Sequence, residues 1–191
     1  NTIAFALHFT AYAYFVRRDP RGMQDALKEL NEVATKYDLT TWQHMPLPFH
    51  GYVLGELDSP DKALAFLSPI FRQFRSYLMA WGPAIWVLVC AKNGDFVTGL
   101  EVIEKVLGYN EYTWLAELYR LRGKLLLMRE ESPSIETIYN AEANFQQAIQ
   151  IAQAQNAKSW ELRASISLAK LWHRQGKTRE ALNLLAPIYA W

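Results

Sequence analysis

The chain has 191 residues, of which 51% are apolar and 20% charged, a composition that excludes intrinsic disorder. The formal charge of +1 provides no general attraction to nucleic acid or to an anionic membrane. The only cysteine, Cys90, excludes a disulfide framework within the chain, and residues 84–91 around it form too short an apolar run to span a bilayer.

Helical periodicity runs through nearly the whole chain, and the alternation typical of strands is almost absent, which predicts an all-α fold. The pattern predicts about five helical hairpins, at residues 1–37, 41–77, 81–109, 114–156 and 158–191. Turn signals separate the two helices of four hairpins, at residues 19–22, 58–60, 93–95 and 175–177. In the hairpin at 114–156, a longer polar loop at residues 129–134 takes this place.

A small residue, followed by apolar residues four and seven positions later, recurs in the second helix of each expected hairpin. The sets are Ala26/Leu30/Val33, Ala63/Leu67/Ile70, Gly99/Ile103/Val106, Ala141/Phe145/Ala148 and Ala181/Leu185/Ile188. The leading residues are 37, 36, 42 and 40 positions apart. These offsets put the three residues of each set on one stripe of the helix. The small residue that begins each set leaves room for the paired helix to approach closely. The middle of the first helix lies at Tyr14, Gly51, Val87, Gly123 and Ala169 in the five hairpins.

Two of these segments resemble the tetratricopeptide repeat (TPR). Ala141-x3-Phe145-x2-Ala148 resembles the second-helix signature of that family, and Leu168-Ala169-x2-Trp172 resembles its first-helix signature. The resemblance implies that residues 1–191 form one solenoid, a right-handed superhelix of stacked hairpins, because a single hairpin cannot bury its own apolar face. A closed helical bundle is the alternative architecture.

A second resemblance concerns residues 114–127, 157–164 and 184–189. These segments are similar to the C-terminal repeats of large bacterial proteins known as predicted ATPases, many of which carry a nucleotide-cyclase domain. The resemblance implies a non-catalytic sensing or protein-interaction arm of a signalling ATPase. A cytoplasmic location fits, because Arg17 and Arg18 follow the apolar opening stretch, whereas the basic residues of a signal peptide precede it. The chain lacks an initial Met and ends within an apparent helix, so we expect it to be part of a larger multidomain protein.

The sequence offers no catalytic, cofactor or metal site. Gly176-Lys177-Thr178 lacks the glycine five positions earlier that a phosphate-binding loop requires, and it joins two helices. His44 and His50 are six residues apart, a spacing that does not align them on one helix face, and no cysteine is near. We therefore expect that the chain is not an enzyme and that any ATPase or cyclase activity lies outside it.

A basic groove is the expected binding surface, because the first helices of TPR hairpins line the concave side. The fourth and fifth hairpins would direct these residues inward: Glu117, Arg120, Lys124, Arg163, Lys170, His173 and Arg174. Their first helices carry seven basic residues against two acidic ones, an excess of five positive charges in a nearly neutral chain. The hypothesis is that this groove binds an acidic peptide or protein.

The sequence bears on three other binding modes. A small-molecule sensor, similar to the sugar-binding repeats of maltose-type transcription activators, would use Tyr52 and Trp81 with Trp42 as aromatic platforms. Recognition of single-stranded RNA is disfavoured, because the basic residues cluster in two hairpins and the net charge is low. Apolar residues at both ends of the chain, Ile3, Phe5, Ile188 and Trp191, predict either self-association or exposed patches.

Overall fold

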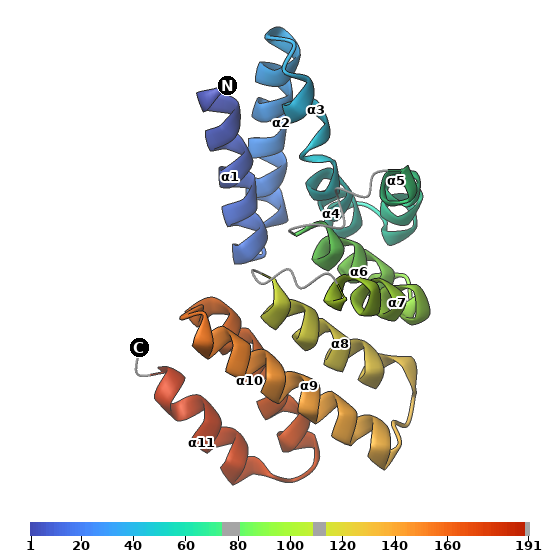
Figure 1. The fold of residues 1–191 in the computed structure, drawn as a ribbon, viewed down its shortest axis with the longest axis vertical. Helices are drawn as coiled ribbons and strands as arrows, with labels where there is room; N and C mark the ends of the chain where they lie inside the picture. Colours follow the sequence, from blue (N-terminus) through green and yellow to red (C-terminus); the bar gives the residue numbers. More distant parts are fainter. Residues whose placement is uncertain (74–80, 109–113, 190–191) are drawn as a thin grey trace. The chain divides into compact units, whose positions relative to one another are not determined.

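The computed structural model describes residues 1–73, 81–108 and 114–189, and every regular element in these ranges is an α-helix (Figure 1). The helices are α1 (Thr2–Arg17), α2 (Pro20–Lys36), α3 (Thr40–His44), α4 (Leu47–Leu57), α5 (Pro60–Gln73), α6 (Gly82–Lys92), α7 (Phe96–Leu107), α8 (Leu115–Arg129), α9 (Ile135–Ala154), α10 (Lys158–Arg174) and α11 (Thr178–Tyr189). The predicted all-α class is confirmed. The expected contribution of Trp191 to an apolar end lies outside the described residues.

The chain divides into two compact units, Asn1–Asp95 and Phe96–Trp191. Unit 1 contains α1 to α6, and unit 2 contains α7 to α11. The division falls within the expected hairpin at residues 81–109, so that α6 belongs to unit 1 and α7 to unit 2.

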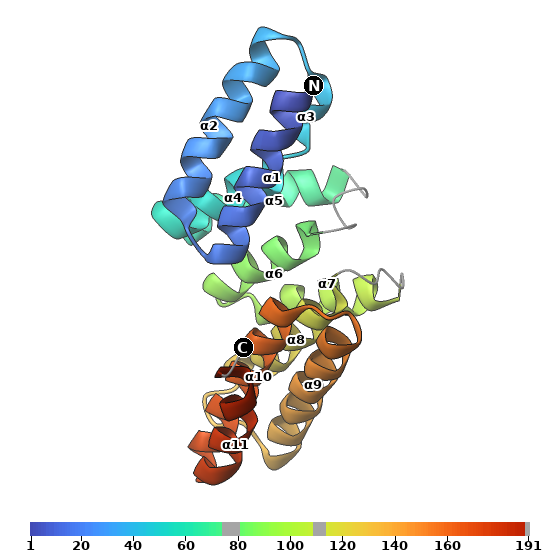
Figure 2. The ribbon, with the colours of Figure 1, turned by 90° about the vertical axis from the view of Figure 1, so that its left-hand side faces the viewer.

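Unit 1 is built on the hairpin of α1 and α2, which lie side by side (Figure 2). Arg18 takes the left-handed conformation (φ 60°) that ends α1. Asp19 then caps α2 by accepting a hydrogen bond from the Gly22 N–H at 2.9 Å, and Pro20 fills the first helical position. The following hairpin adds a layer, since α4 packs against α2 and α5, and α6 packs against α4 and α5.

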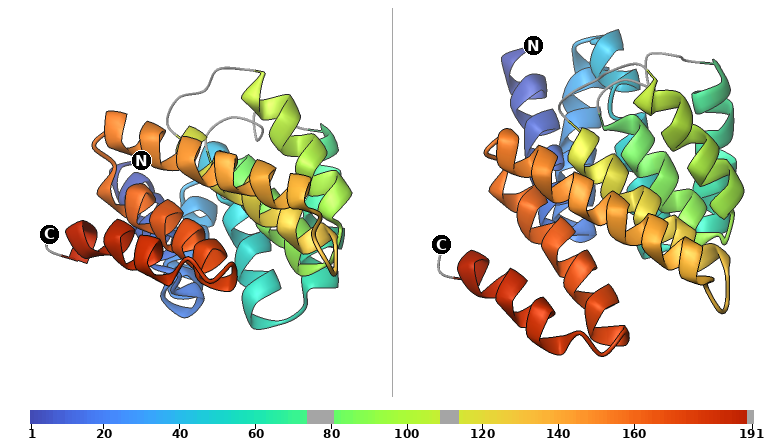
Figure 3. Two further views of the ribbon diagram at one scale, coloured as in Figure 1. Left: turned by 90° about the horizontal axis from the view of Figure 1, so that it is seen from below. Right: turned by 60° about the horizontal axis from the view of Figure 1, so that its bottom comes forward.

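Unit 2 is organised around α8, α9 and α10. α8 packs against α7, α9 and α10, while α10 also packs against α9 and forms a hairpin with α11 (Figure 3). Ser134 caps α9 by accepting a hydrogen bond from the Thr137 N–H at 3.0 Å. Gly176 makes the turn between α10 and α11 with φ +80°, a conformation that glycine adopts without steric cost.

The repeated triads form the core, as their spacing predicts. All five leading residues, Ala26, Ala63, Gly99, Ala141 and Ala181, are buried. In unit 2, α9 packs its triad against Ala164 and Leu168 of α10 in one apolar cluster. Gly123 of α8 packs tightly against this stripe. A Cβ atom added at Gly123 would lie 2.8 Å from Phe145 Cε1 and 2.9 Å from the Ala141 carbonyl oxygen.

We predict that Gly123→Ala lowers the free energy of unfolding. Alanine is intrinsically better than glycine in a helix by about 1 kcal/mol, but the added methyl group would force α8 away from the backbone of α9. Overpacking of this kind typically costs about 1–3 kcal/mol, so the net change should be destabilising. Chemical denaturation monitored by circular dichroism measures it, and an unchanged or raised stability would contradict the close contact.

Candidate functional site

The acidic residue of the predicted groove, Glu117, forms a buried ion pair with Arg120 on the same helix. Both carboxylate oxygens accept hydrogen bonds from the guanidinium, from Nε and from Nη2, each at 2.7 Å. The two residues are 2% and 9% exposed. Burial would lower the pKa of Arg120, but the adjacent carboxylate outweighs it and raises that pKa above its ordinary value. Arg120 is therefore a fixed cation whose main partner lies within the protein.

Arg163 joins this pair from α10. Its Nη1 lies 3.5 Å from the Glu117 carboxylate, and its guanidinium carbon lies 5.0 Å from the centre of the Trp160 ring. Trp160 in turn contacts the ring of Trp114 edge to face, with centroids 4.9 Å apart. This stacking over an aromatic face orients the planar guanidinium. Arg163 is half-buried, with 18% of its side chain exposed.

The register of α8 and α10 places the other predicted basic residues. Trp114 contacts Trp160, and Glu117 contacts Arg163; both contacts join residues 46 positions apart. Two contacts with one offset mean that the helices run in the same direction, side by side. The same offset pairs Lys124 with Lys170, two helical turns further along.

These C-terminal residues of the two helices are solvent-facing. Lys124, Lys170, His173 and Arg174 are all exposed, and His173 Nδ1 lies 3.4 Å from the Thr178 hydroxyl. We call Lys124, Arg163, Lys170 and Arg174 the α8/α10 basic face. Its buried N-terminal end contains the Glu117–Arg120 pair, and its open end contains cations on both helices.

Part of the basic excess is neutralised by carboxylates. Arg122 pairs with Glu104 of α7 at 2.6 Å, a contact between hairpins that the local sequence does not indicate. Lys158 pairs with Glu161 at 3.1 Å, three residues along the same helix, a spacing that is visible in the sequence. Glu161 is already one of the two acidic residues in the sequence count, so only the pairing of Arg122 with Glu104 lowers the excess of five positive charges.

The aromatic residues of unit 1 form a packed cluster. His8 is fully buried, and the ring centroids of Phe9, Trp42, Phe49 and Trp81 lie 5.3–5.6 Å from that of His8. Neither ring nitrogen of His8 has a hydrogen-bond partner among the described residues. This burial lowers the pKa of His8 to about 4, so its imidazole is neutral at pH 7.

Two of the three aromatic platforms expected in unit 1 differ in their surroundings. Trp81 is half-buried and stacks on Phe49 and on Tyr12, with centroid distances of 5.5 and 5.2 Å. Tyr52 is buried against Phe15, with centroids 4.9 Å apart. Tyr52 is thus part of the core and does not line an open groove.

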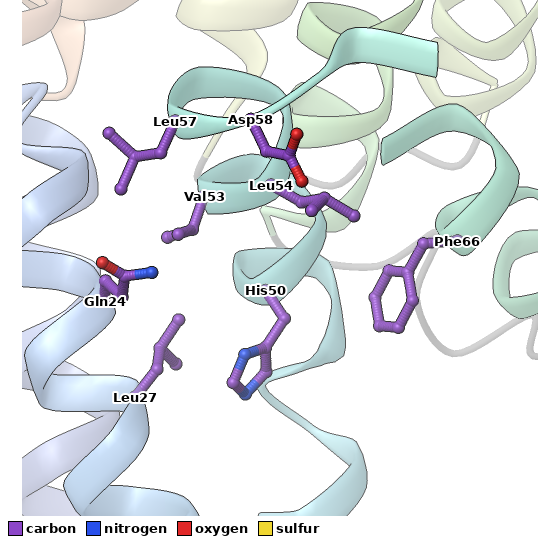
Figure 4. A pocket seen from close by; sticks show the side chains of 8 residues that line it. All are labelled: Gln24, Leu27, His50, Val53, Leu54, Leu57, Asp58 and Phe66. Carbon is purple, nitrogen blue, oxygen red and sulfur yellow. The ribbon is translucent and has the colours of Figure 1, made fainter. Parts of the chain in front are cut away.

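An open pocket of about 380 Å³ lies elsewhere in unit 1, between α2, α4 and α5 (Figure 4). Its lining residues are Gln24, Leu27, His50, Val53, Leu54, Leu57, Asp58 and Phe66. Partial burial lowers the pKa of His50, so the ring between Leu27 and Phe66 is an uncharged hydrogen-bonding group at neutral pH. The sequence pattern did not indicate this pocket, because its walls come from three helices.

Two features bear on metal binding and on thiol chemistry in the described parts of the chain. Among those residues, no cluster of three His, Cys, Asp or Glu side chains could hold a metal ion. Burial, reinforced by the carboxylate of Asp95, raises the pKa of Cys90 to about 12, so its thiol is not a nucleophile at neutral pH. Among the helices of the described residues, none has the length and hydropathy to cross a membrane.

Comparison with known proteins identifies the fold. No protein-family model and no curated protein matches the chain. One similar solved structure is a kinesin light chain-like protein of Podosopora anserina with nearly identical TPR-like repeats: the TM-score is 0.57 at 13% identity, over 97% of this chain and 92% of that chain. A variant of that protein gives a TM-score of 0.59 at 14% identity, over 100% and 95%. The fold is TPR-like.

We predict that the stability of unit 1 decreases in mild acid because of His8. The unfolded state takes up a proton near pH 6.5, whereas the folded state does so only near pH 4. Stability is therefore unaffected above about pH 6.5 and falls as the pH drops toward 4, by about 3 kcal/mol at most. His50 contributes with the same sign.

Equilibrium denaturation at several pH values, compared between the wild type and His8→Leu, measures the effect. The variant should lose less stability than the wild type between pH 7 and pH 4. His44→Leu, at an exposed histidine, is the matched control and should follow the wild type. Equal pH dependence in wild type and His8→Leu would show that His8 is not the buried neutral group described.

We also predict that Glu117→Ala destabilises unit 2 by about 3–5 kcal/mol. The change leaves Arg120 buried without its counter-ion, and removal of one partner of a buried pair typically has this effect. Glu101→Ala, on the exposed surface of α7, is the control and should change stability by less than about 0.5 kcal/mol. Similar values for the two variants in thermal or chemical denaturation would contradict the burial of the pair.

Proposed function

We propose that the chain is a non-catalytic protein-interaction module that holds an acidic segment of a partner on the α8/α10 basic face. The observation that carries this proposal is the shared offset of 46 residues between α8 and α10. It places two parallel first helices side by side, with exposed cations on each. The TPR-like fold supports the proposal, because repeats of this kind present helical surfaces to extended ligands.

The roles of the basic residues follow from their burial. Arg120 is occupied by Glu117, and the same carboxylate contacts Arg163, so the pair helps to position Arg163. Arg163, with its plane fixed over Trp160, suits bidentate contact with a carboxylate. Lys170 and Arg174 are exposed, one turn apart, and form no ion pair in the parts of the chain that are described. They would act as the outer contacts for the same acidic segment.

The wider context of the module is also a proposal. It rests on the resemblance of residues 114–191 to the repeats of bacterial predicted ATPases, which would make the module a sensing arm of a cytoplasmic signalling protein. The full-length reading frame tests this directly, through the presence or absence of an ATPase or cyclase domain. A sugar-sensing role is less well supported, because Tyr52 is buried and Trp81 is stacked between two rings.

We predict that a peptide rich in glutamate binds the chain and that Lys170→Glu with Arg174→Glu weakens its binding at least tenfold. The two changes replace attraction by repulsion at exposed sites, so the helices should stay intact. The affinity of the wild type should also fall as salt rises, since exposed charges are screened within about 8–10 Å. Fluorescence anisotropy of a labelled peptide gives both quantities.

Charge reversal at Arg120 and Arg163 would be a poorer test, because Arg120 is buried and its reversal would disturb the fold. Lys28→Glu on α2 is the matched control for the Lys170→Glu/Arg174→Glu variant. It reverses one exposed charge in unit 1, far from the α8/α10 basic face in sequence. It should leave the affinity within about twofold of the wild type. No binding by the wild type, or unchanged binding by the double variant, would contradict the proposed function.

A further inference from the structure

The outward face of α1 is apolar and open. Ile3 and Phe5 are 63% and 54% exposed, and Phe9 is also exposed. Beside them lies a groove of about 410 Å³. The groove is lined by Ala6, Phe9, Thr10, Ala13, Tyr14 and Arg17. A face of this composition on one helix suits the packing of a second helix.

An equivalent face exists in another hairpin of the same chain, and there it is buried. The hairpin of α10 and α11 repeats that of α1 and α2 at an offset of 155 residues, from Ala26 to Ala181. This offset maps the six groove residues onto Glu161, Ala164, Ser165, Leu168, Ala169 and Trp172 of α10. Five of these counterparts are buried and the sixth is half-buried.

The counterparts are covered by α9, the second helix of the preceding hairpin. Glu161 accepts a hydrogen bond from Gln153 at 2.9 Å, and the Trp172 indole N–H donates to Glu142 at 2.9 Å. Between these two contacts, Ala164 and Leu168 share an apolar cluster with the α9 triad. The groove on α1 thus corresponds to a surface that a second helix occupies in unit 2.

The matching surface is open on α11. Glu142 of α9, which faces Trp172, directly follows the leading residue Ala141, and the equivalent position on α11 is Leu182. The equivalent on α2 is Leu27, which is 1% exposed where α2 packs against α4, whereas Leu182 is 64% exposed. Leu182 is therefore a large, exposed apolar side chain. Its equivalents Leu27 and Glu142 lie where the second helix of one hairpin packs against the first helix of the next.

We propose that the chain associates head to tail, with α11 of one copy seated in the α1 groove of a second copy. Within one copy, α9 and α10 show how one hairpin packs against the next. The proposed contact would repeat this packing between two copies. In that arrangement Leu182 lies against the C-terminal half of the groove, near Arg17, as Glu142 lies against Trp172. Because the two surfaces differ, the contact is heterologous and leaves one α1 face and one α11 face free on each dimer.

The test is the mass of the purified 191-residue chain in sedimentation velocity at increasing concentration. The wild type should grow beyond its monomer mass of 22.0 kDa. Ala13→Lys blocks the groove, and Leu182→Lys charges the other face; each variant alone should stay monomeric with unchanged helical circular dichroism. An equimolar mixture of the two should form a dimer and nothing larger, because each variant retains the face that the other needs.

Ile135→Lys provides the matched control, since it places the same charge on an 89% exposed apolar residue of α9 that neither surface uses. It should associate like the wild type. The proposal is overturned if the wild type is monomeric at every concentration, or if Leu182→Lys alone still associates, which would indicate a symmetric contact between α1 faces. A mixture of Ala13→Lys and Leu182→Lys that stays monomeric would overturn it as well.

Discussion

A helical hairpin with an apolar stripe on each helix cannot bury both stripes alone, and this chain meets that constraint by stacking one hairpin on the next. The second helix of each hairpin carries a small residue at the centre of its stripe, so that the neighbouring first helix can approach closely. The contact of Gly123 with the backbone at Ala141 is the tightest example in unit 2. On α1 and α11 other apolar residues are exposed, among them Ile3, Phe5 and Leu182.

Stacking also decides which charged residues face solvent. The first turns of α8 and α10 are pressed together through Trp114 and Trp160, and this contact excludes water from Glu117 and Arg120. A buried ion pair of this kind contributes little net stability, but a substitution that removes one partner is strongly destabilising. Further along the same helices, Lys124 and Lys170 are exposed. This helical surface therefore holds a buried ion pair at one end and exposed cations at the other.

The aromatic content of unit 1 has a structural role in the described residues. The rings around His8 fill the space between α1, α3 and α4, and they keep a titratable side chain uncharged. The large rings do not supply a cage open to ligands, since Tyr52 lies in the core and Trp81 is stacked on two neighbours. The pocket beside His50 is a separate open cavity, and four of its eight lining residues are aliphatic.

The sequence by itself determined the helical class, the positions of most helices and the stripe of each second helix, because these depend on local periodicity and on turn residues such as Asp19 and Gly176. It also predicted that Glu117, Arg120 and Arg163 line one surface, since Glu117 and Arg163 occupy equivalent positions in successive first helices. It could not decide which of them are buried, because burial of Arg120 depends on how closely α10 approaches α8. The pairing of Arg122 with Glu104, the pocket of His50 and the enclosure of His8 were likewise decided by tertiary structure. Each joins residues from different hairpins, whose separation is set by side-chain packing and not by any local pattern in the chain.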